Sequence, residues 1–186
     1  PMLYCLGAEV LFLGILFVAS MLSLILVLLV TRDLETVDDY MLTVMQEAAG
    51  VAVAVFLLAR TGKAGLLRRR GSGFFNGLLV GMYPLALIGY NAYNTILFGL
   101  PEGQMLSAWR IVWFFLGMIS VGIAEEFLFR GVIAQTLLEH FGTSRAGVWK
   151  ACLLSGLYFG AAHLTNLIGS APLGVLMQCV FAASLG

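Results

Sequence analysis

Three long stretches without Asp, Glu, Lys or Arg dominate the sequence: residues 10–31, 71–101 and 151–186. A helix needs about 20 largely apolar residues to cross a bilayer, so each stretch is long enough for a span. Hydrophobic residues make up 61% of the chain and charged residues 11%, against roughly 25% charged residues in a soluble domain. We therefore predict an integral membrane protein. A soluble enzyme is excluded, and the net charge of zero excludes a nucleic-acid binder.

The predicted fold class is all-α: a polytopic transmembrane helical bundle of about six spans, forming a single domain over residues 1–186. Continuous apolar runs favour helices over the short alternating segments of a membrane barrel, and a lipid-exposed sheet edge would leave backbone groups unpaired. The sixth span breaks off at Gly186, so we expect the C-terminal part of the bundle to lie beyond it. The expected spans are 8–31, 40–59, 74–98, 109–139, 146–168 and 173–186.

The loops between the first three spans differ sharply in charge. Residues 32–39 carry one basic and four acidic side chains, whereas residues 60–73 carry five of the ten basic side chains. The positive-inside rule places the basic loop, from Arg60 to Gly73, on the cytoplasmic or equivalent side.

Glycine and serine residues predict how the later helices end and pack. Gly142 is expected to stop the long fourth helix, and Ser144 to cap the start of the fifth. The Gly156-x-x-x-Gly160 spacing, like a similar motif at 77–81, lets helix backbones approach closely.

Four ionisable residues lie away from the ends of the predicted spans, at membrane depth: Glu125, Glu126, Arg130 and His163. Each costs roughly 3 kcal/mol at membrane depth, which makes such residues functional candidates. Glu126 and Arg130 are four residues apart, so they can pair on one helix face and have a structural role. Glu125 lies about 100° away around the helix and is free to face a cavity as a general acid or base. A lone histidine on an apolar helix is usually a core residue with its hydrogen bonds satisfied. The presence of the Glu125-Glu126 pair on the preceding helix instead favours a site that His163 shares with these carboxylates.

The predicted depths of Glu125 and His163 agree. Glu125 precedes Glu139, the expected end of the fourth helix, by 14 residues, or about 21 Å along the axis. His163 follows residue 146 by 17 residues, or about 25 Å. We therefore expect the two side chains to meet, provided that the fourth helix is long.

The zinc, aspartate and serine types of intramembrane protease do not fit the sequence. The His-Glu-x-x-His pattern of zinc proteases is absent. Every aspartate lies in the 33–39 loop, so a pair of membrane aspartates of the presenilin type is missing. Ser155 and His163 are eight residues apart on one helix, or roughly 12 Å, too far for a direct hydrogen bond. The three cysteines match no metal-binding or disulfide spacing, so we expect neither a metal nor a cofactor.

The two polar motifs together resemble those of a known family. Glu125-Glu126-x-x-x-Arg130, followed on the next helix by Phe159-x-x-x-His163, is similar to the CPBP family. That family includes CAAX prenyl proteases, bacteriocin-processing and immunity proteins, and glutamic intramembrane endopeptidases. The resemblance covers residues 110–186.

The resemblance implies an intramembrane endopeptidase that acts on a peptide or a lipidated protein at the bilayer. By match to the motifs, Glu125 would activate the hydrolytic water and Glu126 would orient or assist it. Arg130 would hold the carboxylates, with Phe159 in support. His163 would bind water or stabilise the oxyanion, which is typically worth about 3–4 kcal/mol per donor.

One family feature is not found by residue 186: a further histidine with a nearby asparagine on a later helix. His140 precedes the fifth helix and is in the wrong order. Either this motif lies beyond Gly186 or the chain lacks it. Two alternatives therefore stay open. The first is a non-catalytic subunit or immunity factor in a membrane-protein complex, in which Glu125, Glu126, Arg130 and His163 have a structural role. The second is a proton-coupled carrier that uses the buried carboxylates as a relay.

Overall fold

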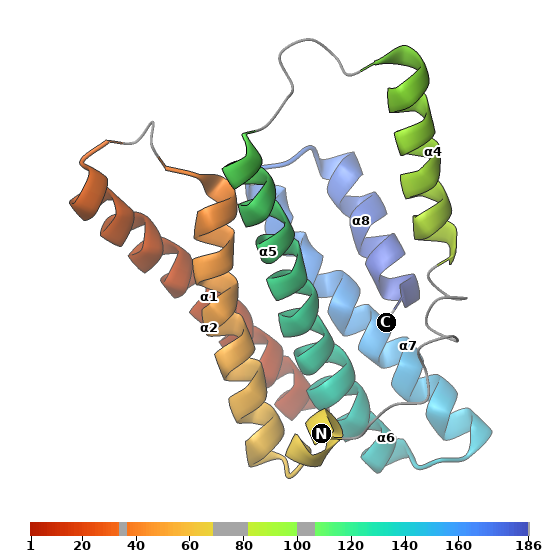
Figure 1. Ribbon diagram of the computed structural model, residues 1–186. Coiled ribbons are helices and arrows are strands. Elements are labelled where there is room, and N and C mark those ends of the chain that lie inside the picture. Colours follow the sequence, from red (N-terminus) through yellow and green to blue (C-terminus); the bar gives the residue numbers. More distant parts are fainter. Residues whose placement is uncertain (34–36, 69–81, 100–106, 186) are drawn as a thin grey trace.

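The protein is described by a computed structural model over residues 1–33, 37–68, 82–99 and 107–185, and all regular structure in these ranges is helical (Figure 1). The predicted all-α bundle is thereby confirmed. In chain order the elements are α1 (Met2–Thr31), α2 (Asp39–Arg60), η1 (Ala64–Arg68), α4 (Met82–Phe98), α5 (Ala108–Glu125), η2 (Glu126–Ala134), α6 (Gln135–Phe141), α7 (Arg145–Ala162), η3 (His163–Ile168) and α8 (Pro172–Leu185).

Four helices in the described part of the chain are long and apolar enough to cross a membrane: α1, α2, the continuous Ala108–Phe141 helix and Arg145–Ile168. The predicted long fourth helix is confirmed, at 34 residues. Of the two remaining expected spans, α8 has 14 residues and α4 has 17. Residues 74–81 of the expected third span lie outside the described residues.

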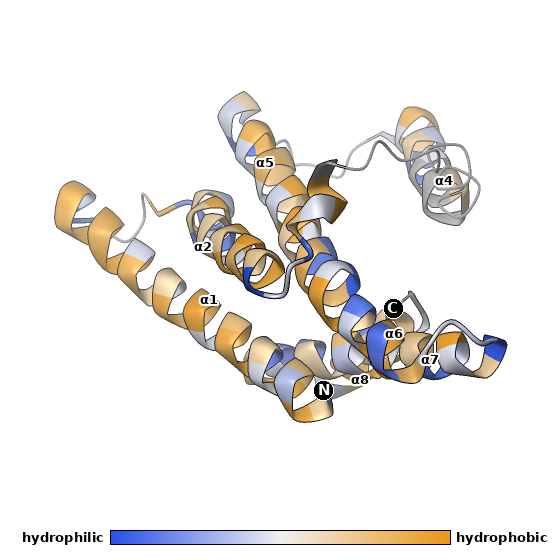
Figure 2. Ribbon diagram, turned by 90° about the horizontal axis from the view of Figure 1, so that it is seen from below, coloured by the Kyte–Doolittle hydropathy of each residue, from blue (hydrophilic) through white to orange (hydrophobic). Residues whose placement is uncertain are grey.

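The bundle is built around the middle of the long fourth helix. α2 packs against both α1 and α5, and α7 packs against α8, η2 and α6, whereas α4 stands apart in both ribbon views (Figures 1 and 2). The best-buried side chains gather on η2 and its neighbours: Leu58, Leu128, Phe129, Val132, Ile133 and Leu137. The outward faces of α1 and α5 are largely apolar (Figure 2), as expected for helices that contact lipid.

Two ion pairs mark opposite ends of α2. Asp38 caps the start of α2 and contacts Arg110 at the start of α5, with 3.0 Å between Oδ2 and Nε. Lys63, just after α2, contacts Glu139 of α6, with 3.0 Å between Nζ and Oε2. The α2 and α5–α6 helices therefore run in the same direction, which agrees with the predicted alternation of loops. The side of the membrane that each end occupies stays a prediction.

The predicted turn between the fourth and fifth helices is confirmed. Gly142 has φ 76°, a conformation that favours glycine, and its N–H donates to Leu138 O at 2.9 Å. Ser144 precedes α7, and its Oγ accepts from Gly147 N at 3.1 Å.

Gly160 permits the close approach of α7 and α8. A Cβ at this position would lie 2.7 Å from Cys179 O and 2.9 Å from the Ala183 Cβ. The small-residue motif therefore brings α8 against the helix that carries the histidine, as its spacing predicts. The other motif, at 77–81, lies outside the described residues.

Candidate active site

The adjacent glutamates lie where the fourth helix changes its winding. Glu125 is the last residue of α5, and Glu126 is the first of the nine-residue π-helical segment η2. We expected an α-helix throughout, so this segment is a correction. Inside η2, the Phe129 carbonyl accepts a hydrogen bond from the buried Ser155 Oγ at 3.3 Å. A π segment is wider than an α-helix and often marks a functional site.

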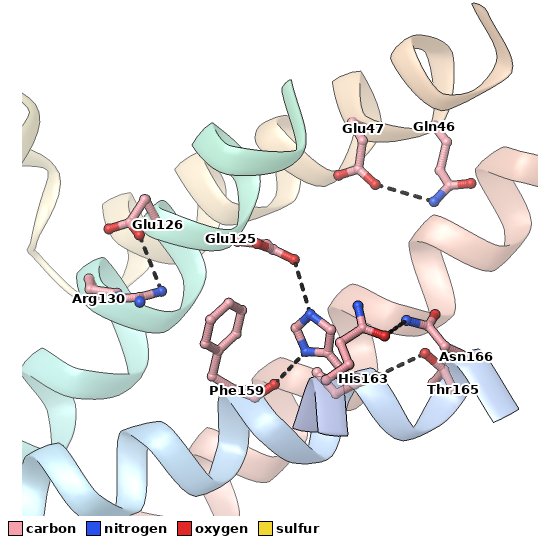
Figure 3. A network of polar contacts seen from close by, with 11 residues as sticks. Gln46, Glu47, Glu125, Glu126, Arg130, Phe159, His163, Thr165 and Asn166 are labelled. Carbon is pink, nitrogen blue, oxygen red and sulfur yellow. Dashed lines mark hydrogen bonds and ion pairs between the residues drawn. The ribbon is translucent and has the colours of Figure 1, made fainter. Parts of the chain in front are cut away.

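The histidine also lies at a change of helix type. α7 ends at Ala162 and His163 begins the 3₁₀ segment η3, whereas we expected one α-helix to residue 168. His163 Nδ1 lies 2.8 Å from Phe159 O. A carbonyl oxygen can only accept, so Nδ1 carries the hydrogen. This bond fixes the ring and directs Nε2 towards the fourth helix (Figure 3).

Glu125 and His163 meet as the depth estimate predicts. Glu125 Oε1 lies 4.0 Å from His163 Nε2, and Figure 3 shows the carboxylate pointing at the imidazole. This separation is longer than a hydrogen bond, but one water at about 2.8 Å from each atom fits between them at an angle of about 90°. A neutral His163 with its hydrogen on Nδ1 accepts at Nε2. Both atoms can therefore accept a hydrogen bond from the same water.

Glu126 and Arg130 form the predicted pair, with 3.2 Å between Oε1 and Nη1. The Glu126 side chain is 58% exposed and does not line the cavity that Glu125 and His163 share. The two glutamates thus face different surroundings, as their positions around the helix predict. The assisting role of Glu126 stays a prediction.

Phe159 joins the two sequence motifs. The Arg130 guanidinium carbon lies 4.7 Å from the centroid of the Phe159 ring, a cation–π distance. The same ring contacts His163 edge-on, with centroids 5.0 Å apart, and packs on Phe129 at 4.8 Å. Phe159 therefore supports the imidazole through both its ring and its carbonyl.

Glu125 and His163 lie on the wall of a cavity of about 280 Å³. Ser155 does not line this cavity, and its hydroxyl donates to the Phe129 carbonyl. Among the described residues, no three His, Cys, Asp or Glu side chains are grouped to hold a metal. The polar cavity-lining residues that sequence reasoning missed are Gln46, Glu47, Thr165, Asn166 and Gln178.

Only Glu47 among these missed residues carried a signal in the sequence. It is the one charged residue within the expected second span, 40–59, and it is 6% exposed in the structure. Its place near the start of the span made it look like a residue at the membrane surface. The neutral amides gave no comparable signal, because glutamine and asparagine carry no charge and are less costly in a membrane helix than an ionised group.

The described helices thus form a membrane-spanning bundle in which a carboxylate and an imidazole line one cavity. Residues 107–185 match the model of a family described as type II CAAX prenyl endopeptidase Rce1-like. This part of the chain is therefore similar to that family, in agreement with the CPBP resemblance, and its apolar helices make the protein a multi-pass membrane protein that resembles the CAAX proteases. No curated protein and no solved structure matched the chain.

Proposed function

We propose that this protein is a glutamate-dependent endopeptidase that hydrolyses a peptide bond in or near the membrane. The observation that carries the proposal is the 4.0 Å separation of Glu125 Oε1 and His163 Nε2 on the wall of one cavity. Peptide hydrolysis needs a base beside a trapped water and space for the scissile carbonyl. This pair and its cavity supply both.

In the proposed reaction, one water donates hydrogen bonds to Glu125 and to His163 Nε2. Glu125 takes a proton from the water as its oxygen attacks the carbonyl carbon, giving a tetrahedral intermediate. The carbon–nitrogen bond then breaks, and the proton on Glu125 passes to the leaving nitrogen. The products are a new carboxylic acid and a free amine, with no other reactant consumed.

Arg130 and Phe159 act as positioning residues in this scheme. The Phe159 carbonyl holds Nδ1 of His163 at 2.8 Å, which leaves Nε2 to bind water. Arg130 lies against the other side of the Phe159 ring and pairs with Glu126. Such supporting contacts preorganise a site, since small misplacements of reacting groups reduce the rate strongly.

The name of the matched family indicates a substrate to test. A C-terminal Cys-aliphatic-aliphatic-X sequence is prenylated on its cysteine. We expect the purified protein in lipid nanodiscs to release the C-terminal tripeptide from a farnesylated peptide of this type, as detected by mass spectrometry. In water enriched in ¹⁸O, the new cysteine carboxylate should carry the label. Failure to cleave the farnesylated peptide and its unprenylated form would contradict the proposal.

A second candidate is a non-catalytic membrane subunit in which the same residues are structural. The contacts from Glu126 through Arg130 to Phe159 favour it, because they join η2 to α7 whether or not hydrolysis occurs. In this case Glu125→Gln would leave cellular function intact, whereas Arg130→Ala would lower yield and assembly. A complementation assay that compares the two variants separates the candidates.

A further inference from the structure

The cavity has a second polar wall that the proposed chemistry does not use. Gln46 and Glu47 on α2, Asn166 on η3 and Gln178 on α8 all line it together with Glu125 and His163. Figure 3 shows Glu47 and Asn166 on the side of the imidazole away from Glu126 and Arg130. We call the four residues Gln46, Glu47, Asn166 and Gln178 the polar wall.

Glu47 is the carboxyl member of the polar wall. It is 6% exposed, within a helix long enough to span the membrane. Its Oε1 accepts one hydrogen bond, from Gln46 Nε2 at 3.3 Å, and among the described residues no ion pair of Glu47 occurs. A carboxylate has about four acceptor sites, and a buried one is costly unless donors satisfy it. Glu47 therefore has acceptor capacity for donors that enter the cavity.

Asn166 and Gln178 offer the complementary groups. Asn166 Nδ2 donates to Gln178 Oε1 at 3.0 Å, which links η3 to α8. This bond leaves the Asn166 carbonyl oxygen as an acceptor and the Gln178 amino group as a donor. A peptide group likewise carries one donor and one acceptor, so two primary amides beside a carboxylate match an extended backbone.

We propose that the polar wall binds the backbone of the substrate peptide beside the Glu125–His163 pair. Backbone N–H groups donate to Glu47 and to Asn166, and a backbone carbonyl accepts from Gln178. The ligand is a short extended segment, because 280 Å³ is at the lower end of ligand pockets. Since backbone groups are recognised, the wall sets the position of the scissile bond rather than the choice of side chains. This inference rests on the proposed function.

Binding is measured in a Glu125→Gln background, so that hydrolysis cannot consume the ligand. The probe is a fluorescent farnesylated Cys-aliphatic-aliphatic-X peptide, titrated by anisotropy against protein in nanodiscs, with the signal of empty nanodiscs subtracted. Adding Glu47→Ala should raise Kd about tenfold to a hundredfold, because hydrogen bonds to a charged group are lost. Glu47→Gln keeps an acceptor oxygen and should raise Kd less than fivefold, by roughly the size of a neutral hydrogen bond.

Two further variants guard against misfolding. Gln178→Ala changes an exposed side chain and should raise Kd about twofold to tenfold, as for one neutral hydrogen bond. The matched control is Glu9→Gln: Glu9 is a carboxyl on α1 that is 5% exposed but does not line this cavity. Its Kd should equal that of the Glu125→Gln parent.

The outcomes separate this inference from the proposed function. A Kd within twofold of the parent for both Glu47→Ala and Gln178→Ala would overturn the polar wall. Glu47-dependent binding by a protein whose unmutated form cleaves nothing would support the wall and contradict the hydrolysis alone. A parent that does not bind the peptide would overturn the wall, even if the unmutated protein cleaves it.

Discussion

The Arg130 guanidinium carbon lies 4.7 Å from the centroid of the Phe159 ring, and that centroid lies 5.0 Å from the centroid of the His163 ring. Arg130 belongs to the first polar motif and Phe159 to the second. The two motifs are thus joined by direct contact across η2 and α7. Neither motif alone predicts this contact, because the contact depends on how the two helices pack.

The Arg130–Phe159 contact should be measurable as a coupling energy. Arg130→Gln and Phe159→Leu each remove one partner, and a cation–π contact of this kind is worth about 0.5–2 kcal/mol. We expect the two changes to be non-additive by that amount in a double-mutant cycle of denaturant unfolding in detergent. Additive free energies of unfolding would show that the two side chains are neighbours without a favourable interaction.

The hydrogen bond from His163 to Phe159 predicts one tautomer. Nδ1 lies 2.8 Å from the Phe159 carbonyl oxygen, so neutral His163 should carry its hydrogen on Nδ1. Nitrogen-15 NMR of ring-labelled protein in lipid should show a protonated Nδ1 and an unprotonated Nε2. His140, the other histidine of the chain, is assigned by its loss in His140→Gln. A spectrum in which His163 is protonated on Nε2 alone would refute the proposed water-binding geometry.

Gly160 sets the distance between α7 and α8. A methyl group there would lie 2.7 Å from Cys179 O, so the helices must separate. We expect Gly160→Ala to lower the free energy of unfolding by about 1–3 kcal/mol and to weaken substrate binding, because α8 carries Gln178. Gly174→Ala on α8 is the matched control, since nothing lies within 4 Å of its added methyl. Equal stability of both variants would show that α8 can shift freely.

The Lys63–Glu139 ion pair joins two partners of unequal burial. The Lys63 side chain is 8% exposed and that of Glu139 is 66% exposed. Removing Glu139 therefore leaves a buried ammonium, which is more harmful than removing the whole pair. We expect Glu139→Ala to lower the thermal unfolding temperature more than the double change Lys63→Met with Glu139→Ala. A double variant that is less stable than Glu139→Ala alone would contradict this.

The sequence predicted the course of the helices well because hydropathy and turn chemistry are local. The long fourth helix, the turn at Gly142 and Ser144, and the close approach at Gly160 are all confirmed. The changes to π winding at Glu126 and to 3₁₀ winding at His163 were not predicted. Both depend on tertiary contacts, such as the bond from Ser155 to the Phe129 carbonyl.

The candidate site was predicted in part. The estimated depths along the two helices predicted that Glu125 and His163 meet, because the rise per residue converts a sequence position into a distance. The polar wall was missed, since whether Glu47 faces a cavity or the membrane surface depends on how α2 packs against α5. Glu9 was missed for the same reason. It is the second residue of the expected first span, where it looks like a residue at the membrane surface, but the packing of α1 buries it.

The central claim is that Glu125 is the base that activates water, and Glu125→Gln tests it most directly. Glutamine keeps the shape of the side chain but cannot take the proton, so kcat for the farnesylated peptide should fall about 100- to 10,000-fold. The unfolding temperature and peptide binding should stay close to those of the unmutated protein. Glu9→Gln, which changes a similarly buried carboxyl outside the cavity, should leave kcat unchanged. A Glu125→Gln variant that cleaves within threefold of the unmutated rate would contradict the account.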